Sequence, residues 1–134
     1  MQSNVPNYIV DAVQVAMDLA LVSRENGMKH CHGALAFKKG KIVGHGFNSR
    51  GSSWLQRLYA NALNMIEKKY EHAEVAAIRR SQSADSLLVV RVNSNEELVN
   101  SKPCAICRAL IEDSKIKHLY YSGTGELKYE RIWR

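Results

Sequence analysis

Four residues in two short segments have the types and the spacing of a catalytic metal site. His72 and Glu74 stand two positions apart, and Cys104 and Cys107 stand three apart in a later segment. Zinc prefers histidine and cysteine ligands, and a catalytic zinc keeps three protein ligands and an open fourth position for water. Zinc lowers the pKa of that water from 15.7 to about 7, and a carboxylate such as Glu74 can carry its protons. We therefore predict one catalytic zinc ion per chain, bound by His72, Cys104 and Cys107.

The order of these residues resembles that of the zinc-dependent nucleobase deaminases. The chain reads His72-Ala73-Glu74 and later Pro103-Cys104-Ala105-Ile106-Cys107, which matches the H-x-E and P-C-x-x-C signature of that group. The resemblance is to the cytidine and deoxycytidylate deaminase superfamily. It implies hydrolysis of a cytosine-type nucleoside or nucleotide, such as cytidine, deoxycytidine, CMP or dCMP, to the uracil product and ammonia. Glu74 is then the proton shuttle.

Each half of the motif lies near the start of a predicted helix. Apolar spacing predicts helices over residues 72–81 and 104–113. Cys104 and Cys107 share one face of the second helix, and Pro103 suits its first turn. The partial positive charge of a helix N-terminus favours thiolates over thiols. We therefore expect two helix N-termini to converge on one metal ion.

The pattern along the rest of the chain predicts one domain over residues 1–134 with a three-layer α/β/α, cytidine-deaminase-like fold. The other predicted helices cover residues 8–26 and 54–70. The predicted strands cover residues 33–37, 42–47, 86–92, 116–121 and 126–133. The third and fourth strands should be parallel across a short crossover, and a glycine turn should return the fifth antiparallel, giving a five-stranded mixed sheet. By resemblance, an antiparallel fifth strand is closer to the free-nucleoside cytidine deaminases than to the tRNA adenosine deaminases.

Composition and charge limit the partners of this chain. Its 134 residues, 46% hydrophobic and 24% charged, suit one globular domain, and no apolar run reaches the roughly 18 residues of a membrane span. The start lacks the pattern of a signal peptide, so we expect a cytoplasmic protein with reduced thiols and no membrane partner. A net charge of +6 suits an anionic partner such as a nucleotide or a nucleic acid. The resemblance also implies a homo-oligomer.

Residues after the second predicted strand are candidates for substrate binding. Phe47, at the end of that strand, and Asn48, which follows it, are both candidate substrate-binding residues. The resemblance implies that Asn48 contacts the sugar or base. Cytidine deaminases carry a glutamate two residues further on, but this chain has Arg50. A cation there could bind a phosphate, which favours a nucleotide or a strand over a free nucleoside, or it could be a solvated loop residue. The resemblance further implies that the backbone amides of Ala73 and Cys104 hold the base and the oxygen that attacks it.

A second hypothesis is an editing enzyme that deaminates cytosine or adenine in single-stranded DNA or RNA. Trp54, Tyr59 and Tyr70 could stack on bases, but their spacing better fits the inner face of a helix or a subunit contact. The polynucleotide cytidine deaminases carry Ser-Trp-Ser before the Pro-Cys pair. This chain has Asn100-Ser101-Lys102 instead, which weakens the match.

A third hypothesis is a catalytically silent module that zinc merely stabilises, but such a module has no need of Glu74. We do not expect a second metal site at His30-Cys31-His32. Alternate residues of a strand point to opposite faces, and residues 49–71 hold no further histidine or cysteine. Cys31 is then a buried thiol.

Overall fold

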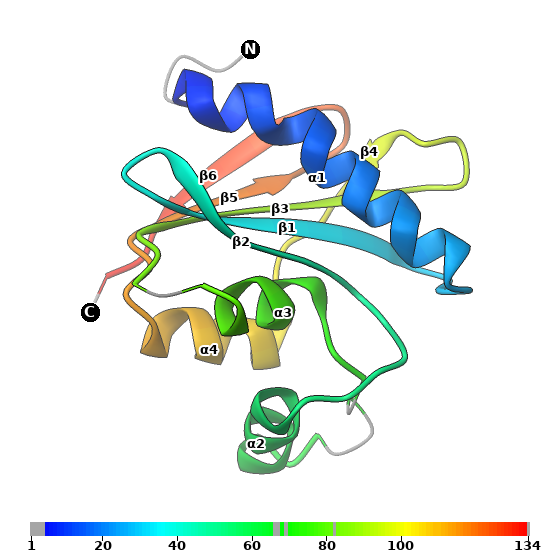
Figure 1. Ribbon diagram of the computed structural model, residues 1–134, viewed down its shortest axis with the longest axis vertical. Coiled ribbons are helices and arrows are strands. Elements are labelled where there is room, and N and C mark those ends of the chain that lie inside the picture. Colours follow the sequence, from blue (N-terminus) through cyan, green and yellow to red (C-terminus); the bar gives the residue numbers. More distant parts are fainter. Residues whose placement is uncertain (1–4, 66–67, 69, 82, 134) are drawn as a thin grey trace.

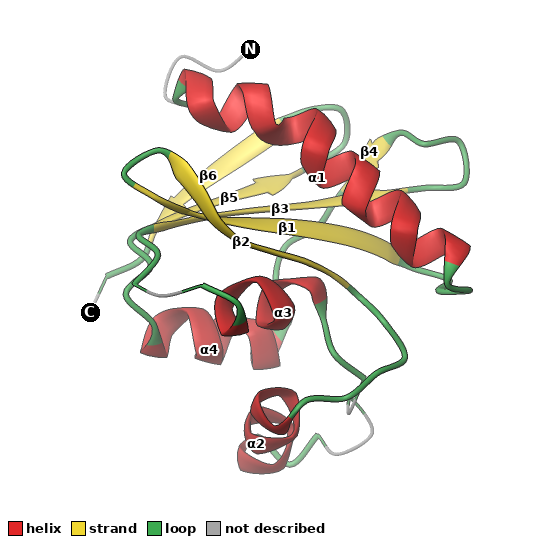
Figure 2. Cartoon of the chain, in the orientation of Figure 1, coloured by secondary structure: helices red, strands yellow, loops and turns green. Residues whose placement is uncertain are grey.

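The computed structural model has a mixed β-sheet between two layers of helices (Figures 1 and 2). It describes residues 5–65, 68, 70–81 and 83–133. The helices are α1 (Asn7–Glu25), α2 (Trp54–Ala62), α3 (Ala73–Arg79) and α4 (Ala105–Asp113). The strands are β1 (Cys31–Lys38), β2 (Lys41–Phe47), β3 (Ser86–Val92), β4 (Leu98–Val99), β5 (His118–Ser122) and β6 (Leu127–Arg131). Helix α1 covers one face of the sheet, α3 and α4 cover the other, and α2 lies outside them.

The strand order is β2-β1-β3-β5-β6, and β4 pairs with the end of β3. Strands β3 and β5 are parallel, whereas the other pairs are antiparallel. The predicted α/β fold is thus confirmed, with a mixed sheet and an antiparallel last strand. The structure adds β4, which has only two residues and is too short for side-chain alternation to reveal it.

The predicted helix over residues 54–70 is wrong in its length. Helix α2 begins as the sequence indicates, because the Ser53 hydroxyl accepts a hydrogen bond from the backbone N–H of Gln56 at 3.2 Å. It ends at Ala62, and Asn64 then adopts a φ of 56°. Asparagine tolerates this left-handed conformation, but a helix cannot continue through it. Residues 66–67 and 69 of the predicted helix lie outside the described residues.

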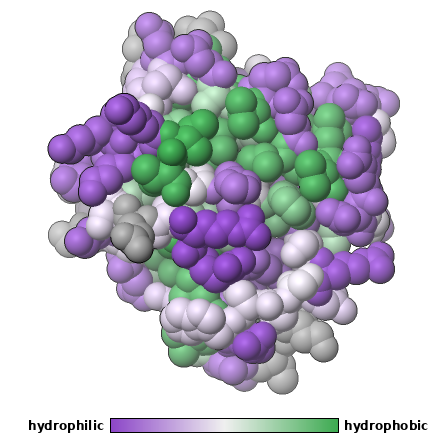
Figure 3. Space-filling model, viewed as in Figure 1, coloured by the Kyte–Doolittle hydropathy of each residue, from purple (hydrophilic) through white to green (hydrophobic). Residues whose placement is uncertain are grey.

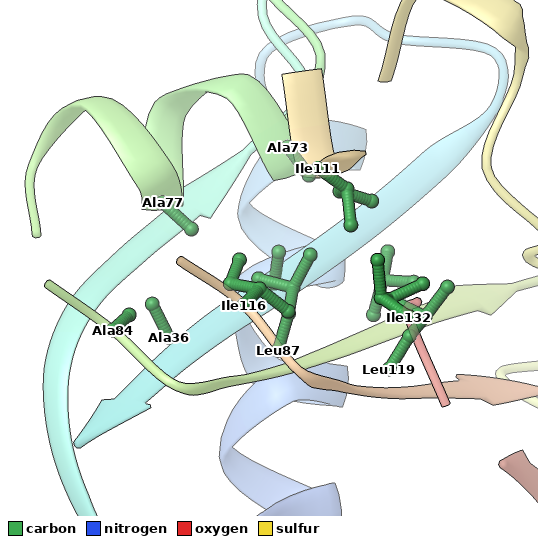
Figure 4. Close-up of a cluster of buried hydrophobic side chains, with 11 residues drawn as sticks. Ala36, Ala73, Ala77, Ala84, Leu87, Ile111, Ile116, Leu119 and Ile132 are labelled. Carbon is green, nitrogen blue, oxygen red and sulfur yellow. The ribbon is translucent and has the colours of Figure 1, made fainter. Parts of the chain in front are cut away.

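A cluster of buried side chains joins α3 and α4 to the sheet (Figure 4). Small side chains alternate with large ones there: Ala36, Ala73 and Ala77 let the layers approach, and branched residues fill the remaining space. The large members are Leu87, Val89, Ile111, Ile116, Leu119 and Ile132. Burying each such side chain is worth about 1.5–3 kcal/mol, so this cluster holds both helices of the motif against one face.

Gly46 decides how closely α3 approaches β2. A Cβ atom at this position would lie 2.5 Å from the carbonyl oxygen of Ala73 and 2.6 Å from the Cβ of Ala76. A larger residue would therefore push the helix away from the strand. The first turn of α3 is fixed on the sheet at the point where the His72 segment enters it.

The surface carries hydrophilic and hydrophobic side chains side by side on the face shown in Figure 3. Trp54 is 64% exposed, so it does not lie on the inner face of α2 as its spacing suggested. Tyr59 is half-buried and donates a hydrogen bond to Asp113 Oδ2 at 2.7 Å, which ties α2 to α4. None of the described helices is both long enough and apolar enough to span a bilayer.

Candidate metal centre and substrate cavity

The three predicted zinc ligands lie together at the starts of α3 and α4. His72 and Cys104 occupy the N-cap positions of α3 and α4, so both precede the first turn of their helix. Pro103 stands one residue before the N-cap of α4. His72 Nδ1 lies 3.2 Å from Cys107 Sγ and 3.5 Å from Cys104 Sγ. The three ligand atoms all lie within 4.8 Å of one another. Tetrahedral zinc with normal bond lengths places such atoms about 3.5–3.8 Å apart, so the group fits one zinc ion.

The protonation of the two thiols also suits a metal. A hydrogen bond from Cys107, and further bonding to His72, lower the pKa of Cys104 to about 3. The hydrogen bond to Cys104 and burial raise the pKa of Cys107. The pair therefore holds one proton, which a zinc ion would displace.

Glu74 lies in the first turn of α3 and is only 4% exposed. Burial raises the pKa of its carboxyl, although the charge of His72 opposes this shift. The carboxyl also hydrogen-bonds the Cys107 thiol and lines the cavity beside the ligands. A buried carboxyl whose pKa is raised can accept a proton and release it to a neighbouring group.

A cavity of about 490 Å³ opens onto this centre. Its volume falls in the range of about 300–1,000 Å³ that is usual for small-molecule sites. The predicted site residues on its wall are Asn48, His72, Ala73, Glu74 and Cys104. Phe47 and Arg50 are not among the lining residues, and Arg50 instead donates a hydrogen bond to the Gly27 carbonyl oxygen at 3.3 Å.

Asn48 follows β2 and connects it to α1 and to the start of β1. Its Oδ1 accepts a hydrogen bond from the backbone N–H of His32 at 2.8 Å. The Ser23 hydroxyl lies 2.6 Å from both this oxygen and the Asn48 carbonyl oxygen, and its single proton serves one of the two. Asn48 Nδ2 donates to the carbonyl oxygen of His30. His30 uses one of the two Nδ2 hydrogens, so Asn48 can offer a ligand the other one.

Several cationic residues of the cavity wall were not predicted from the sequence. They are Lys29, Lys68, Arg91 and Lys102. Arg91 had a signal in the sequence, since it is the one charged residue in the otherwise apolar run of β3. The lysines had none, because they come from separate loops. His30 and His32 also line the cavity, but among the described residues only His72, Cys104 and Cys107 form a group that could hold a metal.

The family model for the cytidine and deoxycytidylate deaminase zinc-binding region matches residues 7–123. The chain belongs to this family. The predicted zinc-dependent deaminase family is thus confirmed, and His72, Cys104 and Cys107 form a group that could hold one zinc ion. A comparison with the sequences of curated proteins gave no match.

Solved structures of several deaminases share the fold. A dCMP deaminase from the cyanophage S-TIM5 is 23% identical, with a TM-score of 0.59 over 87% of this chain and 83% of that one. A cytidine deaminase from Mycobacterium tuberculosis is 15% identical, with a TM-score of 0.52 over 81% and 83%. A deaminase that edits adenosine to inosine in transfer RNA is 22% identical, with a TM-score of 0.52 over 84% and 74%. At identities below 25%, these similarities show a common fold and do not assign the substrate.

Proposed function

We propose that this deaminase converts a cytosine-type nucleoside or nucleotide to its uracil counterpart and ammonia. The observation that carries the proposal is the buried carboxyl of Glu74 beside three zinc-ligand atoms, on the wall of a cavity large enough for a base and a sugar. A site that bound zinc for stability alone would have no use for a buried carboxyl, which is costly to keep charged. Family membership supports the same reaction class.

The ligands His72, Cys104 and Cys107 would hold the zinc ion, which when bound makes water acidic enough to supply hydroxide near neutral pH. Glu74 takes a proton from the attacking water and passes protons to the ring nitrogen and to the departing amino group. A carbon–oxygen bond forms, the carbon–nitrogen bond breaks and ammonia leaves. Because burial raises the pKa of Glu74, its carboxyl can hold the proton between these steps.

Backbone groups at the start of α3 complete the proposed site. The first N–H groups of a helix have no acceptor within the helix, and Ala73 opens α3 at the cavity wall. We assign its N–H, with that of Cys104, to the base and the attacking oxygen. Asn48 would offer its remaining Nδ2 hydrogen to the sugar or base. The role of Phe47 in substrate binding remains a prediction from the sequence.

Ammonia release from zinc-loaded protein tests the proposal. The panel contains cytidine, deoxycytidine, their phosphates, adenosine, guanine and cytosine-containing oligonucleotides. Glu74→Ala should lower turnover by about 10² to 10⁴-fold and still bind one zinc ion. Glu25→Gln, at an exposed glutamate of α1, serves as the control. Retained turnover in Glu74→Ala would refute the proton shuttle, and no ammonia from any compound would favour the catalytically silent module.

One observation favours a second candidate, an editing enzyme that acts on a single strand. Lys102 lines both the main cavity and a neighbouring cavity of about 430 Å³, whose wall includes Asn100, Tyr121 and Lys128. Two cavities that share Lys102 could hold successive nucleotides, although Glu126 pairs with Lys128 on the wall of the second. Turnover of oligonucleotides without turnover of mononucleotides would identify this activity. Homo-oligomer formation and a cytoplasmic location also remain predictions.

A further inference from the structure

We propose that Arg91, with Lys29 and Lys102, forms a phosphate subsite in the cavity, so that the substrate is a pyrimidine nucleoside monophosphate. The reaction part rests on the deamination proposed above, whereas the binding part does not. Arg91 replaces Arg50 as the cation expected to recognise phosphate, because Arg91 lines the cavity and Arg50 does not.

Side-chain alternation along β3 places Arg91 on the face of the sheet that borders the cavity. Side chains alternate along β3, and Leu87 and Val89 belong to the cluster beneath α3 and α4. Arg91 is the next residue on that face, at the carboxyl end of the strand. Ligands of open α/β sheets bind beyond the carboxyl ends of parallel strands, and β3 runs parallel to β5. His32 lies directly opposite Arg91 on β1 and lines the same cavity.

The cations of this wall are not neutralised by the acidic residues beside them. Glu71 is engaged by Arg79, which donates two hydrogen bonds to its carboxylate at 2.8 and 2.9 Å. Glu74 lies at the metal centre. Within the described part of the chain, Arg91, Lys29 and Lys102 form no ion pair with a carboxylate. The wall therefore presents excess positive charge, which an anionic ligand would balance.

Arg91 is also held in place by its neighbour. Its Nη2 lies 2.9 Å from Nδ1 of His30, which also lines the cavity. A guanidinium held at one nitrogen keeps its other N–H groups for a second partner, and its planar fork matches two phosphate oxygens. Lys29 and Lys102 would add point charges. The same positive field acts on His32, whose pKa is lowered to about 4 first by burial and then by the charge of Arg91.

Kinetics with matched substrate pairs test the subsite. The measured quantity is kcat/KM for CMP and dCMP relative to cytidine and deoxycytidine. We expect the unsubstituted protein to have a higher kcat/KM for the monophosphates than for the nucleosides. Arg91→Gln should lower kcat/KM for the monophosphates at least about tenfold and change kcat/KM for the nucleosides less than about threefold. Arg91→Lys, which keeps the charge but loses the fork, should fall between them. Arg57→Gln, at an exposed arginine of α2, is the control, and thermal unfolding checks that each variant folds.

Binding separates failure of the subsite from failure of the reaction. Calorimetry with UMP, uridine and inorganic phosphate on zinc-loaded Glu74→Gln protein measures recognition without turnover. UMP should bind at least about tenfold more tightly than uridine, and Arg91→Gln should remove the difference. If no compound releases ammonia but this difference is found, the subsite stands and the reaction fails.

Two results would overturn the subsite while leaving the reaction intact. One is equal kcat/KM for nucleosides and their monophosphates. The other is a loss of phosphate selectivity in Arg50→Gln but not in Arg91→Gln. Turnover of oligonucleotides alone would assign the phosphate to a strand and overturn the monophosphate as substrate.

Discussion

Gln56 Oε1 accepts a hydrogen bond from the backbone N–H of His72 at 3.1 Å. The Gln56 side chain is fully buried, and its Nε2 donates to the carbonyl oxygen of Lys68 at 2.9 Å. One amide thus ties α2 to the segment that presents His72, a predicted zinc ligand. The position of His72 therefore depends on a residue outside the motif.

Gln56→Leu should destabilise the protein and weaken zinc binding. The change leaves the His72 N–H and the Lys68 carbonyl without this partner, and each unsatisfied buried group costs about 1–3 kcal/mol. Urea unfolding and zinc titration of the same samples measure both effects. Gln14→Leu, on the exposed side of α1, should change neither. Equal behaviour of the two variants would show that Gln56 does not position the ligand.

Gly46→Ala should cost about 1–3 kcal/mol or more of unfolding free energy. The added methyl group would meet the Ala73 carbonyl oxygen and the backbone nitrogen of Ala77, which lie 2.5 and 2.7 Å from the Cβ position. Gly51→Ala is the matched control, since its nearest atom is the flexible Ser49 hydroxyl at 3.4 Å. The midpoint of thermal unfolding checks the difference, and a Gly46→Ala midpoint equal to that of the control would contradict the tight packing of α3 on β2.

His32 should remain neutral throughout the physiological pH range. Burial, followed by the charges of Arg91, His72 and His30, lowers its pKa from 6.5 to about 4. An NMR titration of its ring protons should therefore show a midpoint near pH 4. In Arg91→Gln the midpoint should rise only partly toward 6.5, because burial is the larger cause.

The lowered pKa of His32 makes the stability of the folded protein depend on pH. The unfolded chain takes up this proton near pH 6.5, whereas the folded protein does so only near pH 4. As the pH falls between these values, the unfolded state binds more protons, so the contribution of His32 to stability decreases. A His32→Gln variant should lose less stability than the natural sequence over this interval. A midpoint near 6.5 in the NMR titration would contradict both statements.

Removal of zinc should lower the stability of the protein. A ligand that binds only the folded state adds about 2.7 kcal/mol when its concentration is 100 times its Kd. Thermal unfolding before and after a chelator measures the loss, and metal analysis should give one zinc ion per chain. Cys107→Ser should lose the metal, but Cys31→Ser should keep it, because Cys31 hydrogen-bonds the Met28 carbonyl oxygen instead. Zinc retained by Cys107→Ser would contradict the ligand assignment.

Features with local causes could be predicted from the sequence alone. The bounds of β3, residues 86–92, follow from a run of branched apolar residues in which Arg91 is the one charged member. His72 lies near Glu74, and Cys104 near Cys107, because each pair is spaced within one turn at the start of a helix. The motif also identified the family, because its residue types and their spacing match the signature of the zinc-dependent deaminases.

Only the tertiary structure decided which residues share the cavity. Arg91, Lys29 and Lys102 come from a strand end and two loops, and no periodicity in the chain reports that they meet. Arg50 has the right charge and stands close to Asn48, yet it turns to the Gly27 carbonyl. Local spacing determines which side chains a helix or strand presents on one face. Convergence of distant segments depends on how the layers pack, and here close contacts such as that of Gly46 with Ala73 set that packing.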